Sequence, residues 1–106
     1  GLSSLEVLHL YNNELITLPE RIFNGLSSLE ILDLKFNRLM SLPKGILNGL
    51  SSLKVLYLDE NALITLPEGI FNGLSSLRLV SLGGNQIDQK TIDRVRQRHP
   101  EIKIYY

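Results

Sequence analysis

Apolar and polar positions along the chain follow a pattern that recurs every 24 residues. The phrase NGLSSL occurs at 24–29, 48–53 and 72–77, and GLSSL opens the chain at 1–5. Aligned on their first Leu, segments 5–19, 29–43 and 53–67 all read L-x-x-L-x-L-x-x-N-x-L-x-x-L-P, and 77–91 follows them in part. A fixed period of this length predicts stacked repeats, each of which buries its apolar face against its neighbours.

Within each unit, the apolar fourth and sixth positions alternate with variable residues. An alternation of period two predicts a short strand with one buried face. The residues expected to point inward are Leu8, Leu10, Leu32, Leu34, Leu56, Leu58, Val80 and Leu82. Similar units running in one direction can pair their strands as a parallel sheet, with roughly a dozen and a half residues for each return path. Pro at the end of each motif, and Gly in NGL, predict two bends on that path; Gly1 occupies the same place as these glycines.

The ninth place of every unit is Asn, where the chain turns out of the strand. A short amide there can satisfy backbone groups that the turn leaves unpaired, and removing one is expected to cost about 1–3 kcal/mol. These structural residues are Asn13, Asn37, Asn61 and Asn85.

The motif L-x-x-L-x-L-x-x-N-x-L resembles the leucine-rich repeat signature, in its typical class of 24 residues. The resemblance implies an α/β solenoid, a curved right-handed superhelix with a parallel sheet on its concave face. Loops and short 3-10 or α turns are implied for the convex face. It covers residues 1–87, with units starting near 5, 29, 53 and 77, and implies that the concave sheet binds proteins.

Residues 88–106, DQKTIDRVRQRHPEIKIYY, depart from the repeat and predict a C-terminal cap made of a helix and a strand. Asp88 or Gln89 is expected to start the helix, and Pro100 prevents its continuation. The side chains expected to face inward are Ile92, Val95, Ile102, Ile104 and Tyr106, and those expected to face outward are Lys103 and Tyr105.

The chain contains no cysteine, so it can form neither a disulfide nor a thiolate metal site. This favours a cytoplasmic-type, reducing environment, or export without oxidative folding. The cysteine-free cap is similar in style to those of bacterial leucine-rich repeat effectors and of cytosolic eukaryotic repeat proteins. Near-identical units indicate recent duplication and favour the bacterial origin, so an effector exported into a host cell is one expectation.

Charge gives no sign of a nucleic-acid or membrane partner, because Lys plus Arg and Asp plus Glu both number 11. The basic segment 90–98 is interpreted as the solvated face of the terminal helix, and no apolar run reaches membrane-spanning length.

Terminal repeats need a polar cover, and none is expected ahead of Leu2 and Leu5, so the first strand is predicted to expose an unpaired edge. Either the chain is a piece of a longer protein, or another molecule, such as a second copy, covers the uncapped N-terminal strand.

The fifth, seventh and eighth places change chemistry from unit to unit while the core places stay fixed. Aromatic anchors among polar groups are typical of protein interfaces. The candidate partner-binding residues are His9, Tyr11, Asp33, Lys35, Phe36, Tyr57, Asp59, Glu60 and Tyr105. The aliphatic third row is either the floor of this interface or simply a strand preference; its members are Val7, Ile31, Val55 and Leu79.

The sequence therefore predicts a protein–protein interaction module that recognises another protein through its concave sheet. The alternative is a structural or self-associating scaffold with no dedicated ligand. We expect no enzymatic activity, because Ser81 lies about 10 Å from Asp33 and about 14 Å from His9 in the predicted row. No cofactor and no metal site are expected, since the two histidines lie at opposite ends of the chain.

Overall fold

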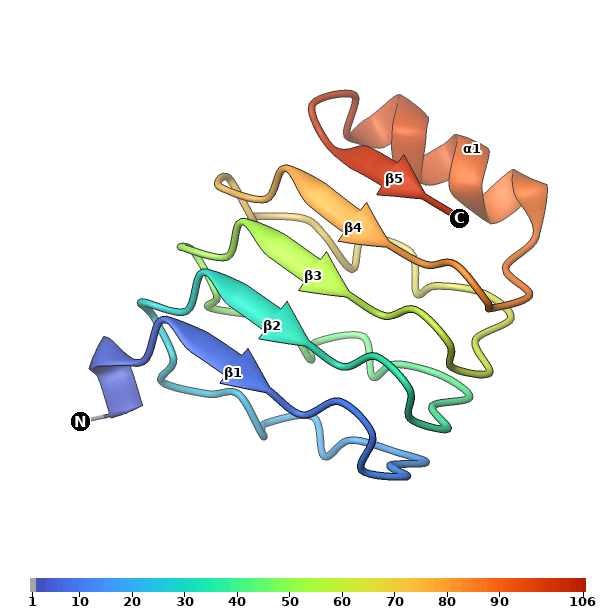
Figure 1. Cartoon of the computed structure of the whole chain (residues 1–106). Coiled ribbons are helices and arrows are strands. Elements are labelled where there is room, and N and C mark those ends of the chain that lie inside the picture. Colours follow the sequence, from blue (N-terminus) through green and yellow to red (C-terminus); the bar gives the residue numbers. More distant parts are fainter. Residues whose placement is uncertain (1) are drawn as a thin grey trace.

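The repeats stack as a single parallel sheet in chain order. The computed structural model describes residues 2–106, residue 2 by its backbone alone, so Gly1 lies outside the described residues. The elements are η1 (Leu2–Ser4), β1 (Val7–His9), β2 (Ile31–Asp33), β3 (Val55–Tyr57), β4 (Leu79–Ser81), α1 (Gln89–Arg98) and β5 (Lys103–Tyr105). The five strands follow the order β1-β2-β3-β4-β5, with the return segments behind them and α1 at the far end (Figure 1).

Strand pairing joins residues that occupy the same place in successive units. Val7 pairs with Ile31, Ile31 with Val55, and Val55 with Leu79. The last strand keeps this register, since Leu79 pairs with Lys103. Each place of the motif therefore becomes a row of side chains that runs across the sheet, and the fold is the expected repeat solenoid.

The core consists of the inward leucines and the apolar residues of the return path. Leu32, Leu56 and Val80 are almost inaccessible to solvent, whereas Leu8 and Leu10 are only half-buried. The difference arises because, within the described residues, β1 has a neighbouring strand on one side only.

The return path is built from hydrogen-bonded turns. In the first unit, the N–H of Ile22 donates to the carbonyl of Pro19 at 3.0 Å, and the N–H of Leu26 donates to that of Phe23 at 3.2 Å. The bend after each Phe or Leu of the convex side needs a positive φ, which is +85° at Gly25. Glycine adopts this conformation without steric strain, which explains why NGL recurs.

The C-terminal cap covers the last repeat. Asp88 is the N-cap of α1, and its carboxylate accepts a hydrogen bond of 3.1 Å from the N–H of Thr91. Ile92, Ile102 and Ile104 are buried as expected. None of the helices in residues 2–106 has the length and apolar character needed to cross a membrane.

The expected inward orientation of Tyr106 is wrong. The strand ends at Tyr105, so alternation no longer fixes the next side chain, and Tyr106 is 55% exposed. Its ring lies 4.9 Å from the guanidinium of Arg96, and its hydroxyl hydrogen-bonds to Gln89. Tyr106 therefore ties the end of the chain to the outer face of α1.

Candidate functional site

The asparagine of each turn fixes the edge of the exposed sheet face, which we call the concave face. The side-chain amide of Asn37 donates to the carbonyls of Leu10 and Leu34 at 3.0 Å each. Its oxygen accepts from the N–H groups of Asn13 and Leu15, also at 3.0 Å. Asn37 thus joins two units through four backbone groups.

Asn61 and Asn85 repeat most of this arrangement, but Asn13 does not. Asn61 donates to Leu34 and Leu58, and Asn85 donates to Leu58 and Leu82. Asn13 is exposed, and its amide donates to the carbonyl of Tyr11 at 3.3 Å. The expected uniform cost of removing each Asn therefore does not apply to the first unit.

The residue before each Asn lies in the left-handed backbone region. The φ angles are +60° at Asn12, +57° at Phe36, +60° at Glu60 and +76° at Gly84. A bulky residue in this region is disfavoured by about 1 kcal/mol or more. Phe36 is in addition 56% exposed, so neither burial nor backbone preference explains a phenylalanine at this position.

Asp33 lies at the centre of the candidate set, but it is buried. It is 5% exposed, so its side chain mainly supports the residues around it. One carboxylate oxygen accepts from the N–H of Lys35 at 3.1 Å, and the other lies 3.3 Å from His9 Nδ1. The ammonium of Lys35 lies 3.9 Å from the same oxygen as His9. These neighbours cover Asp33 and are held in place by it.

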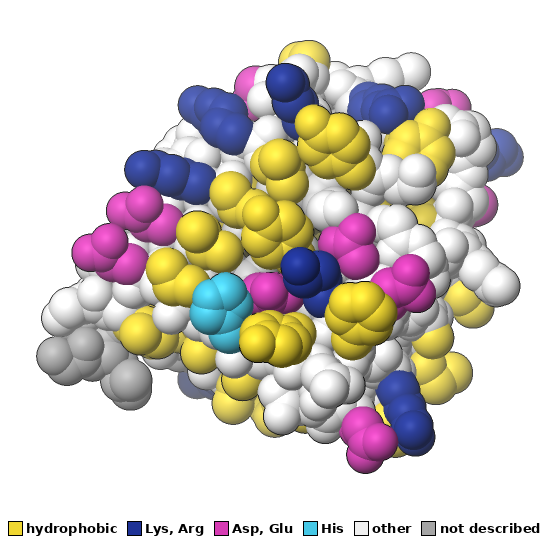
Figure 2. Space-filling model, in the orientation of Figure 1, with side chains coloured by type: hydrophobic (Ala, Val, Ile, Leu, Met, Phe, Trp, Pro, Cys, Tyr) yellow, Lys and Arg dark blue, Asp and Glu magenta, His cyan; other side chains and the backbone are white. Residues whose placement is uncertain are grey.

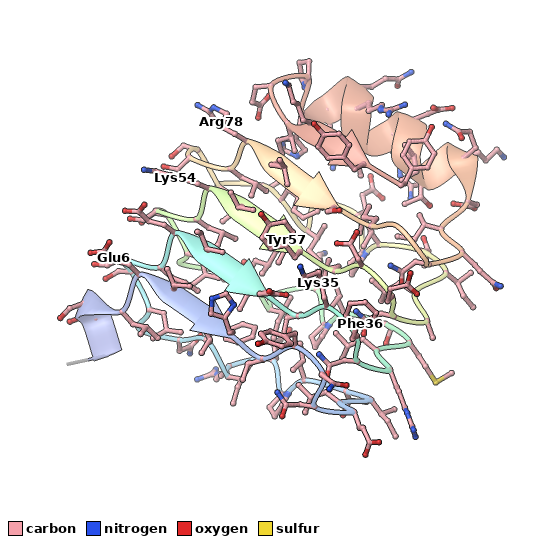
Figure 3. All side chains as sticks on the ribbon, viewed as in Figure 1. Glu6, Lys35, Phe36, Lys54, Tyr57 and Arg78 are labelled. Carbon is pink, nitrogen blue, oxygen red and sulfur yellow. The ribbon has the colours of Figure 1, made fainter. Side chains whose placement is uncertain are left out.

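Aromatic contacts extend this cluster over the first three strands. Lys35 Nζ lies 4.8 Å from the centre of the Tyr57 ring, a cation–π contact. His9 and Tyr11 meet edge to face with their rings 5.8 Å apart. In Figure 3, Lys35 and Tyr57 project from the sheet near one another, and Phe36 lies further along the exit from β2. We call His9, Tyr11, Lys35, Phe36 and Tyr57 the aromatic cluster.

The remaining candidates lie beside or beyond the aromatic cluster. Asp59 accepts a hydrogen bond of 2.6 Å from the hydroxyl of Ser81, and its other oxygen is buried without a partner in the described chain. Glu60 lies against Gly84, where a Cβ would come within 2.5 Å of its carboxyl carbon. Tyr105 is exposed on β5, two strands from Tyr57. The sheet therefore brings Asp59 and Glu60 close to the cluster and leaves Tyr105 apart.

The second place of the units is a row that the sequence analysis did not single out. It reads Glu6, Glu30, Lys54 and Arg78, so its charge changes sign across the sheet. Glu6, Lys54 and Arg78 stand at the starts of their strands along one margin (Figure 3). Figure 2 shows this margin passing from acidic to basic beside a band of hydrophobic side chains. The signal was available in the sequence, because these residues differ between units as the chosen rows do. In the structure Glu6, Lys54 and Arg78 are exposed and Glu30 is half-buried, with its carboxylate 3.3 Å from the ammonium of Lys54.

A second overlooked row lies on the other side of the turn. Ile16, Met40 and Ile64 are all more than half exposed and occupy the twelfth place of their units. We call these three residues the apolar column.

In the part of the chain that the structure describes, the geometry assembles neither a catalytic set nor a metal site. The hydroxyl of Ser81 donates to Asp59 and not to the His9–Asp33 pair. Within residues 2–106, no group of three or more His, Asp or Glu side chains could hold a metal ion. The arrangement is instead an exposed sheet face on which the side chains differ from unit to unit.

Comparison with known families agrees with this description. A model of the leucine-rich repeat matches residues 1–39 and 27–87. The two matches overlap and together cover most of the chain, so the protein belongs to the leucine-rich repeat family. No curated protein matches the chain by sequence.

Several solved structures share the fold. A leucine-rich repeat protein of Leptospira interrogans is 37% identical with a TM-score of 0.86, and covers 96% of this chain and 25% of its own length. The leucine-rich repeat domain of APL1B is 25% identical with a TM-score of 0.84, over 96% of this chain and 31% of that one. A chain of the Toll–Spatzle complex of Drosophila is 29% identical with a TM-score of 0.73, over 78% of this chain and 11% of that one. The chain thus spans about a third or less of the length of each.

Proposed function

We propose that the protein is a recognition module that binds another protein through its concave face. The observation that carries this proposal is Phe36, an exposed aromatic side chain in a disfavoured backbone conformation. The turn imposes this φ at the eighth place of every unit, so an exposed phenylalanine there costs stability and contributes no packing to the fold. Strained residues of this kind cluster where a ligand is held. Aromatic side chains also supply most of the affinity in protein interfaces.

The surroundings of Phe36 support the same function. The cation–π contact with Tyr57 and the ion pair with Asp33 limit the motion of Lys35, so less conformational freedom is lost on binding. The match to a chain of the Toll–Spatzle complex, a protein–protein assembly, also favours a protein partner. We propose no catalytic role for these residues.

Affinity capture tests the proposal with two matched double variants. Phe36→Ala with Tyr57→Ala truncates the aromatic cluster, and Met40→Ala with Ile64→Ala truncates the apolar column on the other side. All four side chains lie partly or largely on the surface, so both variants should remain folded, as thermal unfolding can verify. We expect a partner that the unaltered chain and the second variant retain and the first variant loses. Retention by the first variant and loss by the second would place recognition on the apolar column and refute the proposal.

A self-associating scaffold is the second candidate function, because one edge of β1 has no strand beside it among the described residues. The backbone groups of Glu6 and Leu10 hydrogen-bond to β2, so by alternation the N–H and C=O groups of Val7 and His9 face the open edge. Val7→Pro would remove one of these N–H groups and abolish association through the edge. Light scattering over a concentration range would detect the loss. Association that survives this substitution would exclude the edge.

We also propose that the chain is the repeat region of an exported bacterial protein that functions in a reducing environment. The absence of cysteine and the 37% identity to a protein of Leptospira interrogans support this setting. A reporter fused to the chain, active only in the cytosol of a eukaryotic host cell, should then give signal during co-culture with the producing bacterium. A signal confined to the bacterium would refute export into the host.

A further inference from the structure

Two rows of side chains, the second at the margin of the sheet and the seventh at the exits from the strands, change charge sign across the line between β2 and β3. The second row carries two acids on β1 and β2 and two bases on β3 and β4: Glu6, Glu30, Lys54 and Arg78. The seventh row places a cation on one side of that line and an anion on the other, Lys35 and Asp59. Opposite charges at equal distances from a line are the pattern that makes a surface complementary to itself under a two-fold rotation.

We propose that a second copy of this chain occupies the concave face as a two-fold dimer. This inference rests on the proposed function, since it names the occupant of the same face. The two-fold axis lies between the two facing sheets and runs parallel to the strands. It passes over the line that separates β2 from β3. Rotation about it sets β1 opposite β4 of the second copy and β2 opposite β3, with every row facing itself.

Charge is complementary in the second and seventh rows. Glu6 faces Arg78 of the second copy, Glu30 faces Lys54, and Lys35 faces Asp59. The two-fold operation forms each of these contacts twice. Glu30 and Lys54 also pair within one chain, at 3.3 Å, so their facing contacts extend an existing ion pair. Asp59 forms no ion pair within the described chain, and its carboxylate accepts from the hydroxyl of Ser81, so a facing lysine supplies the counter-charge that the fold itself does not. In the fifth and eighth rows, Asp33 faces Tyr57 and Phe36 faces Glu60, so those rows add no ion pair.

Size is complementary as well. The seventh and eighth places of the fourth unit are Gly83 and Gly84, which leave that end of the face bare. The rotation places Tyr11, which is 54% exposed, opposite Gly83 of the second copy. The third row forms an apolar band in which Val7 faces Leu79 and Ile31 faces Val55, so no charge is buried opposite an apolar side chain there.

The area of the face indicates a weak dimer. Four facing strands and about seven residues of height give a patch on the order of 19 by 23 Å, so two copies bury roughly 900 Å² in total. That value lies in the range of weak, transient interfaces. We therefore expect a weak dimer, and association has to be followed from about 1 μM to about 1 mM protein.

Sedimentation equilibrium of charge-reversed variants tests the arrangement. Glu6→Arg alone and Arg78→Glu alone each set like charges opposite one another twice, and each should weaken the dimer by about 10- to 100-fold. An equimolar mixture of the two variants should dimerise like the unaltered chain, because both facing pairs become opposite in sign. The double variant Glu6→Arg/Arg78→Glu should dimerise by itself for the same reason. Lys44→Glu, an exposed change of equal charge on the return path, should have no effect.

Three results would overturn the inference. The first is an unaltered chain that stays monomeric throughout the concentration range. The second is a dimer that neither single reversal weakens, or whose loss the mixture does not restore. The third is a dimer that Val7→Pro abolishes and the charge reversals leave unchanged, which indicates pairing through the edge of β1. A monomeric chain that still captures another protein through Phe36 and Tyr57 would refute the dimer and leave the proposed function standing.

Discussion

The side-chain oxygen of Asn37 accepts a hydrogen bond of 3.0 Å from the N–H of Leu15, 22 residues earlier in the chain. With the bonds to Leu10, Leu34 and Asn13, this contact joins two repeats through one buried amide. The stability of the stack therefore depends on groups that pack no apolar surface.

Asn37→Ala should lower the free energy of unfolding by about 2–3 kcal/mol, because it leaves several buried backbone groups without partners. Asn13→Ala is the matched control and should cost less than about 1 kcal/mol, since Asn13 is exposed. Urea denaturation monitored by circular dichroism measures both values. Equal losses would show that the bridging role of Asn37 is unimportant.

Phe36→Gly should stabilise the fold by about 0.5–1 kcal/mol and weaken partner binding, because glycine accepts the φ of +57° without strain. The neighbouring change Lys35→Gly should instead destabilise, since Lys35 has no positive φ and packs on Tyr57. Thermal unfolding midpoints of the two variants, compared with that of the unaltered chain, measure both effects. A clear loss of stability in Phe36→Gly would mean that Phe36 has a structural role.

Gly84→Ala should destabilise the fold by about 1–2 kcal/mol. The added Cβ meets the carboxyl group of Glu60, and φ at this residue is +76°. Glu60→Ala in the same chain should recover part of the loss, because it removes the collision and leaves the backbone strain. Gly83→Ala provides the comparison, with a Cβ 3.3 Å from Asp59 and no positive φ, and should stay within about 0.5 kcal/mol of the unaltered chain. A double-mutant cycle on the free energy of unfolding measures the coupling between Gly84→Ala and Glu60→Ala. Additive effects of the two substitutions would argue against this contact.

Asp88 makes the stability of the cap dependent on pH. The side chain of Thr91 first, then its backbone N–H, and more weakly Arg94 and Lys90, hold the pKa of Asp88 below its ordinary value. A lowered folded-state pKa adds stability above the unfolded-state pKa, and this contribution is lost as pH falls through the folded-state pKa.

Asp88→Asn keeps an N-cap side chain but cannot ionise. The unfolding midpoint of the unaltered chain should fall more steeply than that of Asp88→Asn as pH drops below the ordinary range of a carboxyl group. Midpoints measured from neutral pH to about pH 2 test this. Parallel curves for the two proteins would refute a contribution from Asp88.

The sequence alone was sufficient to predict the strand rows and the cap helix, because both follow from periodicity and local chemistry. Leu32 and Leu56 face inward as their spacing requires, and Asp88 caps α1 as an acid before an amphipathic segment should. The place of Tyr106 was missed because alternation applies only while the strand continues, and β5 ends one residue earlier.

The candidate surface was harder to read from the sequence, because burial on a sheet face depends on side chains from neighbouring strands. Asp33 occupies an outward place yet is covered by His9 and Lys35, which no pattern within its own unit reveals. The left-handed conformation of the eighth place was also hidden, since Phe36 and Glu60 are poor indicators of it and only Gly84 is typical.

The common register of the strands has a further consequence for how such a surface can change. Val7, Ile31, Val55 and Leu79 occupy equivalent positions, and the inward leucines beneath them are nearly identical from unit to unit. Exchanging units 29–52 and 53–76 would therefore leave the core almost unaltered while permuting the order of charges along the margin from acid–acid–base–base to acid–base–acid–base. A change in the order of the units would therefore change the pattern of charges on the surface without introducing any new side chain.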